Sequence, residues 1–172
     1  MDRDQLRTVQ TPLKERYASD PPSAMVTLRA EGELDGEEIA CSVATGRALV
    51  EAGLHPATGG SGELACSGDM LLQALVACAG VTMRSVATSL EIPVAGKVRA
   101  EGDLVFRGTL GVGERGEAPV GFREIRLGFE LESDAGDERL QTLLRLTERY
   151  CVVLQTLTGG APVAVSVAVA DG

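Results

Sequence analysis

Two cysteines of this sequence, Cys78 and Cys151, stand inside its most apolar helical segments. Cys78 lies in the run MLLQALVACAGVTM, and Cys151 lies in ERYCVVLQTL. A cysteine thiolate is a nucleophile, and two thiols that meet can be oxidised to a disulfide. The alternative is that both are small hydrophobic side chains of a core, since free cysteine is among the most buried residue types. Nothing in the sequence favours a chemical role for Cys41 or Cys66, so Cys78 and Cys151 are the candidate reactive pair.

An acidic residue, Asp69, stands at the start of the segment that carries Cys78. A carboxylate at this position suits the positive end of a helix dipole and can cap the helix. An ideal helix turns by about 100° per residue, so Asp69, nine residues before Cys78, faces the opposite side. Asp69 can therefore act on Cys78 only through a cation from another segment, and helix capping explains it equally well.

Two long helices are predicted to position the two cysteines. The first covers about residues 69–90, and because its early turns have almost no polar face, it is expected to be buried on all sides. The second covers residues 134–157, where apolar residues recur at helical spacing from Leu140 to Leu154. If the helices pack side by side, the two sulfurs can be neighbours, and a disulfide requires Cα atoms within about 7 Å.

Strands are predicted before and after the first helix, from alternating apolar and polar residues bounded by turn signals. The segments are partly segregated by type, which favours an α+β fold over a doubly wound parallel sheet. A Gly-rich stretch over residues 54–68 is predicted as a long loop before the first helix, and loops of this length are often functional. The strands are expected over 24–34, 38–46, 47–53, 92–108, 121–133 and 161–170.

Length and composition indicate one soluble domain with a short extension. Residues 1–24 are predicted as a helical arm, with Pro12 starting a second short helix, and residues 25–172 as the domain. The net charge of −9 argues against nucleic acid as a partner. The polar N-terminus is not a signal peptide, and no apolar run approaches the about 20 residues of a membrane span, so a cytoplasmic protein without a membrane partner is expected. The cysteines form no CxxC pair, and no metal or bound cofactor is expected.

The segment GSGELACSGDMLLQALVACAGVTM followed by ERYCVVLQTLTGGAPV resembles the OsmC/Ohr family of thiol-dependent peroxidases. The shared pattern is a Gly-rich loop, an acid near a helix start, an apolar stretch that ends in cysteine, and a second cysteine in a later helix. The resemblance covers about residues 25–170. It implies an OsmC-like fold, with antiparallel sheets around two central buried helices, and an intertwined homodimer with its sites at the subunit interface.

The resemblance also implies roles for the site residues. Cys78 would attack an organic hydroperoxide and become a sulfenic acid, Cys151 would condense with it to a disulfide, and an external dithiol would reduce the disulfide. Such an activity serves defence against oxidative or osmotic stress. Asp69 would occupy the position of the acid, usually glutamate, that holds an activating arginine.

The arginine that the family uses to activate its cysteine has no obvious counterpart. The N-terminal turn reads GELDGEE and the following loop GLHPATGGSG, neither of which contains arginine. Arg29 and Arg47 flank these segments and are possible site-lining residues. His55, as an imidazolium, could supply the same charge below its pKa. The family commonly has proline after the second cysteine, where this sequence has Val152.

Three hypotheses follow from these observations. The first is a cytoplasmic, cofactor-free peroxidase that acts on organic hydroperoxides with Cys78 and Cys151. The second is a non-catalytic module of the same fold that binds a small hydrophobic ligand, which the altered acid and the missing arginine favour. The third is a purely structural dimer in which both cysteines are inert.

Overall fold

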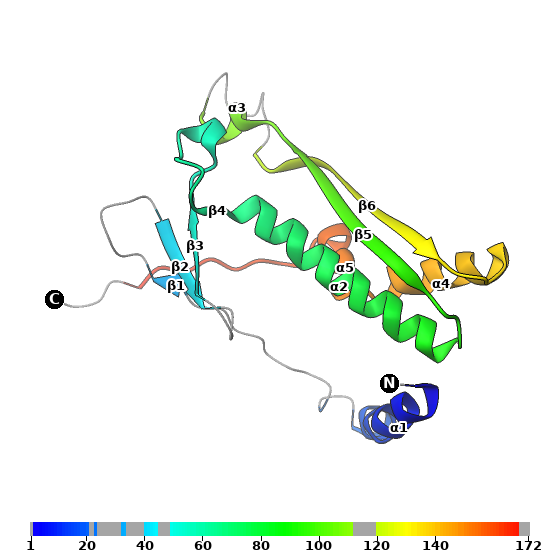
Figure 1. Ribbon diagram of the computed structural model, residues 1–172. Helices are drawn as coiled ribbons and strands as arrows, with labels where there is room; N and C mark the ends of the chain where they lie inside the picture. The colour runs from blue at the N-terminus through cyan, green and yellow to red at the C-terminus, as the bar shows by residue number, and fades with distance from the viewer. Residues whose placement is uncertain are drawn as a thin grey trace.

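The computed structural model describes residues 2–20, 23, 32–33, 40–44, 49–111 and 120–168 (Figure 1). It is a mixed α+β structure of helices and two small sheets, as predicted. The elements in chain order are α1 (Arg3–Ser19), β1 (Gly32–Glu33), β2 (Ala40–Ala44), β3 (Leu49–Gly53), η2 (Pro56–Thr58), β4 (Ala65–Cys66), α2 (Ser67–Ser89), β5 (Ala95–Leu104), α3 (Phe106–Thr109), β6 (Phe122–Glu132), α4 (Asp137–Tyr150) and α5 (Val152–Gly159).

The long helix α2 is the centre of the structure and confirms the helix predicted over residues 69–90. It packs along the ribbon formed by β5 and β6 and against α4 and α5 (Figure 1). Its buried side chains recur every fourth residue, which places them on one face of the helix. They are Leu75, Ala79, Met83 and Ala87.

The opposite face of α2 is exposed, so the prediction that this helix is buried on all sides is wrong for the single chain. Ala74 and Ala77 are exposed, and Val81 is 72% exposed. The physical reason is that the elements packed on α2 within the described residues, namely β5, α4 and α5, cover one side of the helix. Among the helices of the described residues, α2 alone has the length and hydropathy of a membrane span, a property that core helices of soluble proteins share.

The strands β5 and β6 form the predicted hairpin with one wet face. They pair antiparallel from Ala95 opposite Glu132 to Leu104 opposite Phe122. Val98 and Ala100 of β5 pack toward the helices, while Lys97, Arg99 and Glu101, which alternate with them, are exposed. This alternation is what a half-buried antiparallel pair requires. The inner face of the ribbon is therefore an apolar surface against which α2 packs.

The second long helix is divided in two at Cys151, which corrects the single helix predicted over residues 134–157. Cys151 has φ −73° and ψ 105°, an extended conformation that interrupts the helix. Its N–H donates to Thr147 O at 3.0 Å and so ends α4, and its carbonyl accepts from the Gln155 N–H at 2.9 Å and so begins α5. The apolar stripe continues across the break, which is why the spacing of apolar residues did not reveal it.

The N-terminal strands form a separate sheet in the order β1-β2-β3-β4. The pairs β1–β2 and β2–β3 are antiparallel, and β4 pairs parallel to β3. The stretch predicted as a loop over 54–68 contains η2, β4 and the start of α2. Most of the strand predicted over 24–34 lies outside the described residues. The predicted arm contains one helix, α1, with Pro12 inside it rather than at the start of a second helix.

The C-terminal segment contradicts its prediction. No strand forms over the described part, residues 161–168, of the segment predicted as a final strand. Val163, Val165 and Val167 are 85%, 92% and 89% exposed. Alternating valine favours an extended backbone, but a strand also requires a hydrogen-bonding neighbour, and the described part of this chain provides none.

The core at the α2–α4 interface permits a prediction about stability. Leu143 of α4 is completely buried and packs with Met83, Ala87 and Ile92. Replacing Leu143 with alanine removes buried methyl groups and leaves a cavity, so we expect a loss of about 2–5 kcal/mol in the free energy of unfolding. Urea denaturation measures it, and Leu157→Ala, at a helical position that is 37% exposed, is the control with a smaller expected loss.

Candidate active site

The structure brings Cys78 and Cys151 together. Cys151 is completely buried and forms a cluster with Leu75 and Ala79 of α2, against which the half-buried Cys78 packs. The two thiol groups are free and interact with each other. The contact arises because α5 lies beside the middle of α2 (Figure 1). The two cysteines are therefore placed where oxidation can join them.

The surroundings of the cysteine pair are apolar. The ribbon contributes side chains from both strands, and α5 contributes two more from its first turn. Such walls exclude water, which strengthens every polar interaction made inside them. The side chains packed against the cluster are Val98, Ala100, Ile125, Leu127, Phe129, Val153 and Leu154.

Polar groups lie close to the Cys78 sulfur in spite of this setting. They are the backbone N–H groups of Val153 and Val152 at the start of α5, the thiol of Cys151 and the hydroxyl of Thr82, and they act on the pKa of the Cys78 thiol. The first N–H groups of a helix have no partner within the helix.

These contacts make the two thiols electrostatically different. Burial opposes ionisation of Cys78, but the hydrogen bonds from Val153, Cys151, Val152 and Thr82 together lower the pKa of its thiol below the ordinary value. Burial raises the pKa of the Cys151 thiol, and the neighbouring Cys78 sulfur raises it further. Negative charge therefore resides on Cys78 first, while Cys151 keeps its proton.

Asp69 and His55 lie away from the cysteine pair. Asp69 is exposed in the first turn of α2. The His55 ring stacks on Phe106 with 4.8 Å between ring centroids, and its Nδ1 accepts a hydrogen bond from the Ala57 N–H. The elements η2 and α3 that hold this ring lie near the start of α2, whereas α5 lies beside its middle (Figure 1). The structure places neither Asp69 nor His55 in the cluster around the cysteines, and their roles stay predictions.

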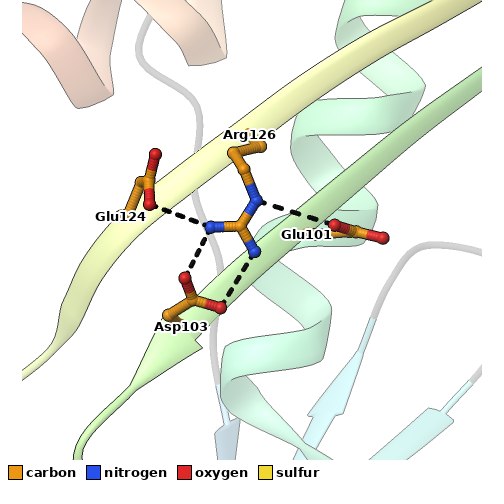
Figure 2. A network of polar contacts seen from close by, with 4 residues as sticks. All are labelled: Glu101, Asp103, Glu124 and Arg126. Carbon is orange, nitrogen blue, oxygen red and sulfur yellow. Dashed lines mark hydrogen bonds and ion pairs between the residues drawn. The ribbon is translucent and has the colours of Figure 1, made fainter.

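The activating arginine stays unassigned, because Arg29 and Arg47 lie outside the described residues. One arginine that the structure does describe, Arg126, is fully engaged on the outer face of the ribbon (Figure 2). Its Nη2 donates to Asp103 Oδ1 at 2.9 Å, and its Nη1 donates to Asp103 Oδ2 and, at 3.0 Å, to Glu124 Oε2. Its Nε lies 3.6 Å from Glu101 Oε2. These contacts hold its charge away from the face that packs on α2.

The fold and the site define a class of protein, in which a β-ribbon covers a central helix and two cysteines from separate helices meet in an apolar cluster. The sequence model of the family described as OsmC-like protein matches residues 60–166. The chain belongs to this family. The matched region contains α2, the ribbon and both cysteines.

Solved structures share the fold at low sequence identity. An OsmC-like protein from Mycoplasma pneumoniae has a TM-score of 0.63 and 17% identity, with 78% of this chain and 89% of that chain covered. The organic hydroperoxide resistance protein OsmC from Legionella pneumophila has a TM-score of 0.54 and 16% identity, with 79% of this chain and 92% of that chain covered. The organic hydroperoxide resistance protein OhrB of Bacillus subtilis has a TM-score of 0.52 and 17% identity, with 79% of this chain and 93% of that chain covered. No curated protein matches the sequence significantly.

Proposed function

We propose that this protein is a cytoplasmic thiol peroxidase that reduces organic hydroperoxides with Cys78 and Cys151, in defence against oxidative or osmotic stress. The observation that carries the proposal is the contact of a thiol of lowered pKa, Cys78, with a buried thiol of raised pKa, Cys151. Two structural neighbours whose names refer to organic hydroperoxide resistance support the choice of substrate.

The chemistry proceeds in three balanced steps. The Cys78 thiolate attacks the terminal oxygen of the hydroperoxide, the O–O bond breaks, and a sulfenic acid forms while the alkoxide leaves and takes up a proton to become an alcohol. The Cys151 thiol then displaces the sulfenic hydroxyl, so that an S–S bond forms and water leaves. An external dithiol exchanges with this disulfide, restores both thiols and is itself oxidised to a disulfide. No metal or bound cofactor takes part.

The surface around Cys78 favours substrates with an apolar tail. Leu71, Ala74 and Val81 lie on the same stripe of α2 as Cys78, and all three are exposed. Val152, which is 69% exposed, follows Cys151 at the start of α5. An alkyl group that leaves water against these side chains gains about 0.8 kcal/mol for each buried methylene, and hydrogen peroxide has no such group.

A second copy of this chain is the proposed cover for the exposed apolar surfaces. The uncovered face of α2 and the valines of the C-terminal segment are too apolar to remain in water without a partner. An intertwined homodimer covers both and places the cysteine pair at a subunit interface. The molar mass in solution tests this proposal, and a stable monomer would count against it.

The substrate preference tests the proposed function. With dithiothreitol as reductant, we expect kcat/KM for cumene hydroperoxide to exceed that for hydrogen peroxide by at least about tenfold, because the aromatic tail is buried on binding. Coupled measurement of peroxide loss gives both constants. Equal values of kcat/KM for the two peroxides would show that the apolar surface does not select the substrate. If neither peroxide is consumed, the proposed peroxidase function is wrong.

One observation favours the alternative of a ligand-binding module. A cavity of about 370 Å³ lies between α2 and the start of β5. Most of its lining is apolar, but Arg84 and Lys97 also border it. A small hydrophobic ligand fits such a space. Native mass spectrometry of the purified protein distinguishes the two functions. A ligand that co-purifies with a protein that consumes no peroxide would support the ligand-binding module.

A further inference from the structure

We propose that the cavity between α2 and the start of β5 binds a medium-chain alkyl carboxylate, with the alkyl chain inside the cavity and the carboxylate on Arg84. The proposal gives a ligand class to the ligand-binding alternative described above. It concerns a site separate from the cysteine pair, so it does not depend on the reduction of peroxides by Cys78.

The cavity lies on a different flank of α2 from Cys78. Gly80, which lines the cavity, follows Cys78 by two residues and is therefore turned by about 200° around the helix axis. Cys78 packs near the start of α5, whereas the cavity is bordered by α2, by residues 94–98 and by Leu131 of β6. Val98 belongs to both groups of residues. A ligand in the cavity can therefore bind without contacting either cysteine.

The absence of a side chain at Gly80 keeps this space open. A glycine within a helix destabilises the helix relative to alanine. A Cβ at Gly80 would lie 3.7 Å from Val98 Cγ2, which is an ordinary contact, so packing within the described residues does not require glycine here. Gly96, which also lines the cavity, differs because its φ is +130° and a Cβ would collide with the Glu130 carbonyl. What glycine supplies at position 80 is room beside Val98.

A cation stands at the border of the apolar space. Arg84 follows Gly80 by four residues, which places the two on the same face of α2. Its Nη1 donates to the Val94 carbonyl at 2.7 Å, and this bond holds the guanidinium at the border of the cavity. The guanidinium has five N–H groups in all, so others can donate to an anion. Lys97 also borders the cavity, and the residues that line it include no acid.

The carboxylates around this region have partners of their own. Three of them stand near Arg84 or Lys97, either beside the neighbouring hollow that Arg84 also borders or across the ribbon. Glu91 pairs with Arg3 at 2.5 Å, Asp2 accepts from the Gln5 N–H at 2.8 Å, and Glu130 pairs with Arg99 at 2.5 Å. Among the described residues, no carboxylate pairs with Arg84 or Lys97. The cavity is thus a cationic site in a chain of net charge −9.

An alkyl carboxylate combines the two parts that this site selects. The volume of about 370 Å³ lies near the lower end of the range for ligand pockets, so a short alkyl chain fits better than a long one. Each methylene that leaves water for an apolar wall strengthens binding about fourfold. A planar carboxylate accepts hydrogen bonds from a guanidinium in a geometry that an alcohol or an amine does not offer.

The test is calorimetric titration of the full chain with octanoate, 1-octanol and acetate at neutral pH. We expect octanoate to bind about tenfold more tightly than 1-octanol, because only octanoate pairs with Arg84. Acetate lacks the alkyl chain and is expected to give no measurable binding. Equal affinities for octanoate and 1-octanol, or no binding of octanoate, would show that the proposal is wrong.

Two arginine variants identify the cation. Arg84→Gln is expected to weaken octanoate binding about tenfold and to leave 1-octanol unchanged, a difference that a general loss of structure would not produce. Arg139→Gln is the matched control. Arg139 is also exposed and also donates to a backbone carbonyl, that of Leu90 at 2.9 Å, but it does not line this cavity. If Arg84→Gln binds octanoate as the unmodified protein does, Arg84 is not the carboxylate's partner and the proposal fails.

A substitution at Gly80 locates the alkyl chain. Gly80→Leu fills the space beside Val98 and is expected to abolish the binding of both octanoate and 1-octanol, while Gly80→Ala, whose Cβ has room, retains it. Cys78→Ser is expected to bind octanoate normally, because Cys78 lies on another flank of α2. Normal binding in Gly80→Leu, or its loss in Cys78→Ser, would place the ligand elsewhere and overturn the proposal. These titrations need no peroxide, so their outcome and that of the peroxidase assays are independent.

Discussion

Replacing Cys78 by serine is expected to reduce the consumption of cumene hydroperoxide by more than about a hundredfold. A serine hydroxyl stays protonated near neutral pH and is a far weaker nucleophile toward an O–O bond than a thiolate. Serine has nearly the shape of cysteine, so the side chains around position 78 keep their places and what is lost is the reacting sulfur alone. Peroxide loss under multiple turnover with dithiothreitol measures the effect.

Cys66→Ser is the matched control for this variant. Cys66 is also free and half-buried, and it immediately precedes α2, where its side chain makes no capping hydrogen bond. Serine is a good residue at that position, so the control is expected to keep its activity and its stability. Undiminished activity in Cys78→Ser would exclude Cys78 as the attacking residue. If peroxidase activity is lost in Cys66→Ser but not in Cys78→Ser, Cys66 at the start of α2 is the attacking residue.

Local patterns were enough to predict the elements that carry the site. The apolar composition of residues 69–90 indicated α2, and the alternation in 92–108 and 121–133 indicated the ribbon. The break between α4 and α5 was not predictable in this way, because the apolar stripe runs through Cys151 without a change of spacing. Val152 stands where proline is common in the family, and proline would have marked the break.

Two errors concern surfaces rather than elements. The composition of α2 predicted a helix buried on all sides, but the described part of the chain covers one face and leaves Val81 exposed. The C-terminal valines likewise have the pattern of a strand, with no strand beside them among the described residues. Local patterns state which side chains avoid water and do not state what covers them.

The candidate site was predictable in its cysteines but not in its electrostatics. The resemblance implied the pairing of Cys78 with Cys151, and Arg29, Arg47 and His55 were the predicted sources of an activating charge. Arg29 and Arg47 lie outside the described residues. Among the described groups, those that lower the pKa of Cys78 are uncharged N–H, thiol and hydroxyl groups, which a pattern of charged residues does not reveal. Thr82 could have been found from the sequence, since a hydroxyl four residues after a cysteine on a helix lies on the same face.

Replacing Cys151 by serine is expected to leave the first step intact and to stop the second. Cys78 still attacks the hydroperoxide, so one equivalent is consumed per chain at close to the normal rate. No thiol then stands beside the sulfenic acid, and dithiothreitol must enter the apolar cluster to reduce it, so turnover falls by about tenfold or more. Stopped-flow measurement of the first equivalent separates the two phases.

The fate of Cys78 in this variant is the sharper readout. A sulfenic acid without a resolving thiol is oxidised further, and intact mass after excess peroxide should show two or three added oxygens on Cys78. Cys66→Ser should show instead the loss of two hydrogens that marks a disulfide. If Cys151→Ser turns over normally and Cys78 stays unoxidised, the buried thiol of α5 is a packing residue and the reductant acts on Cys78 directly.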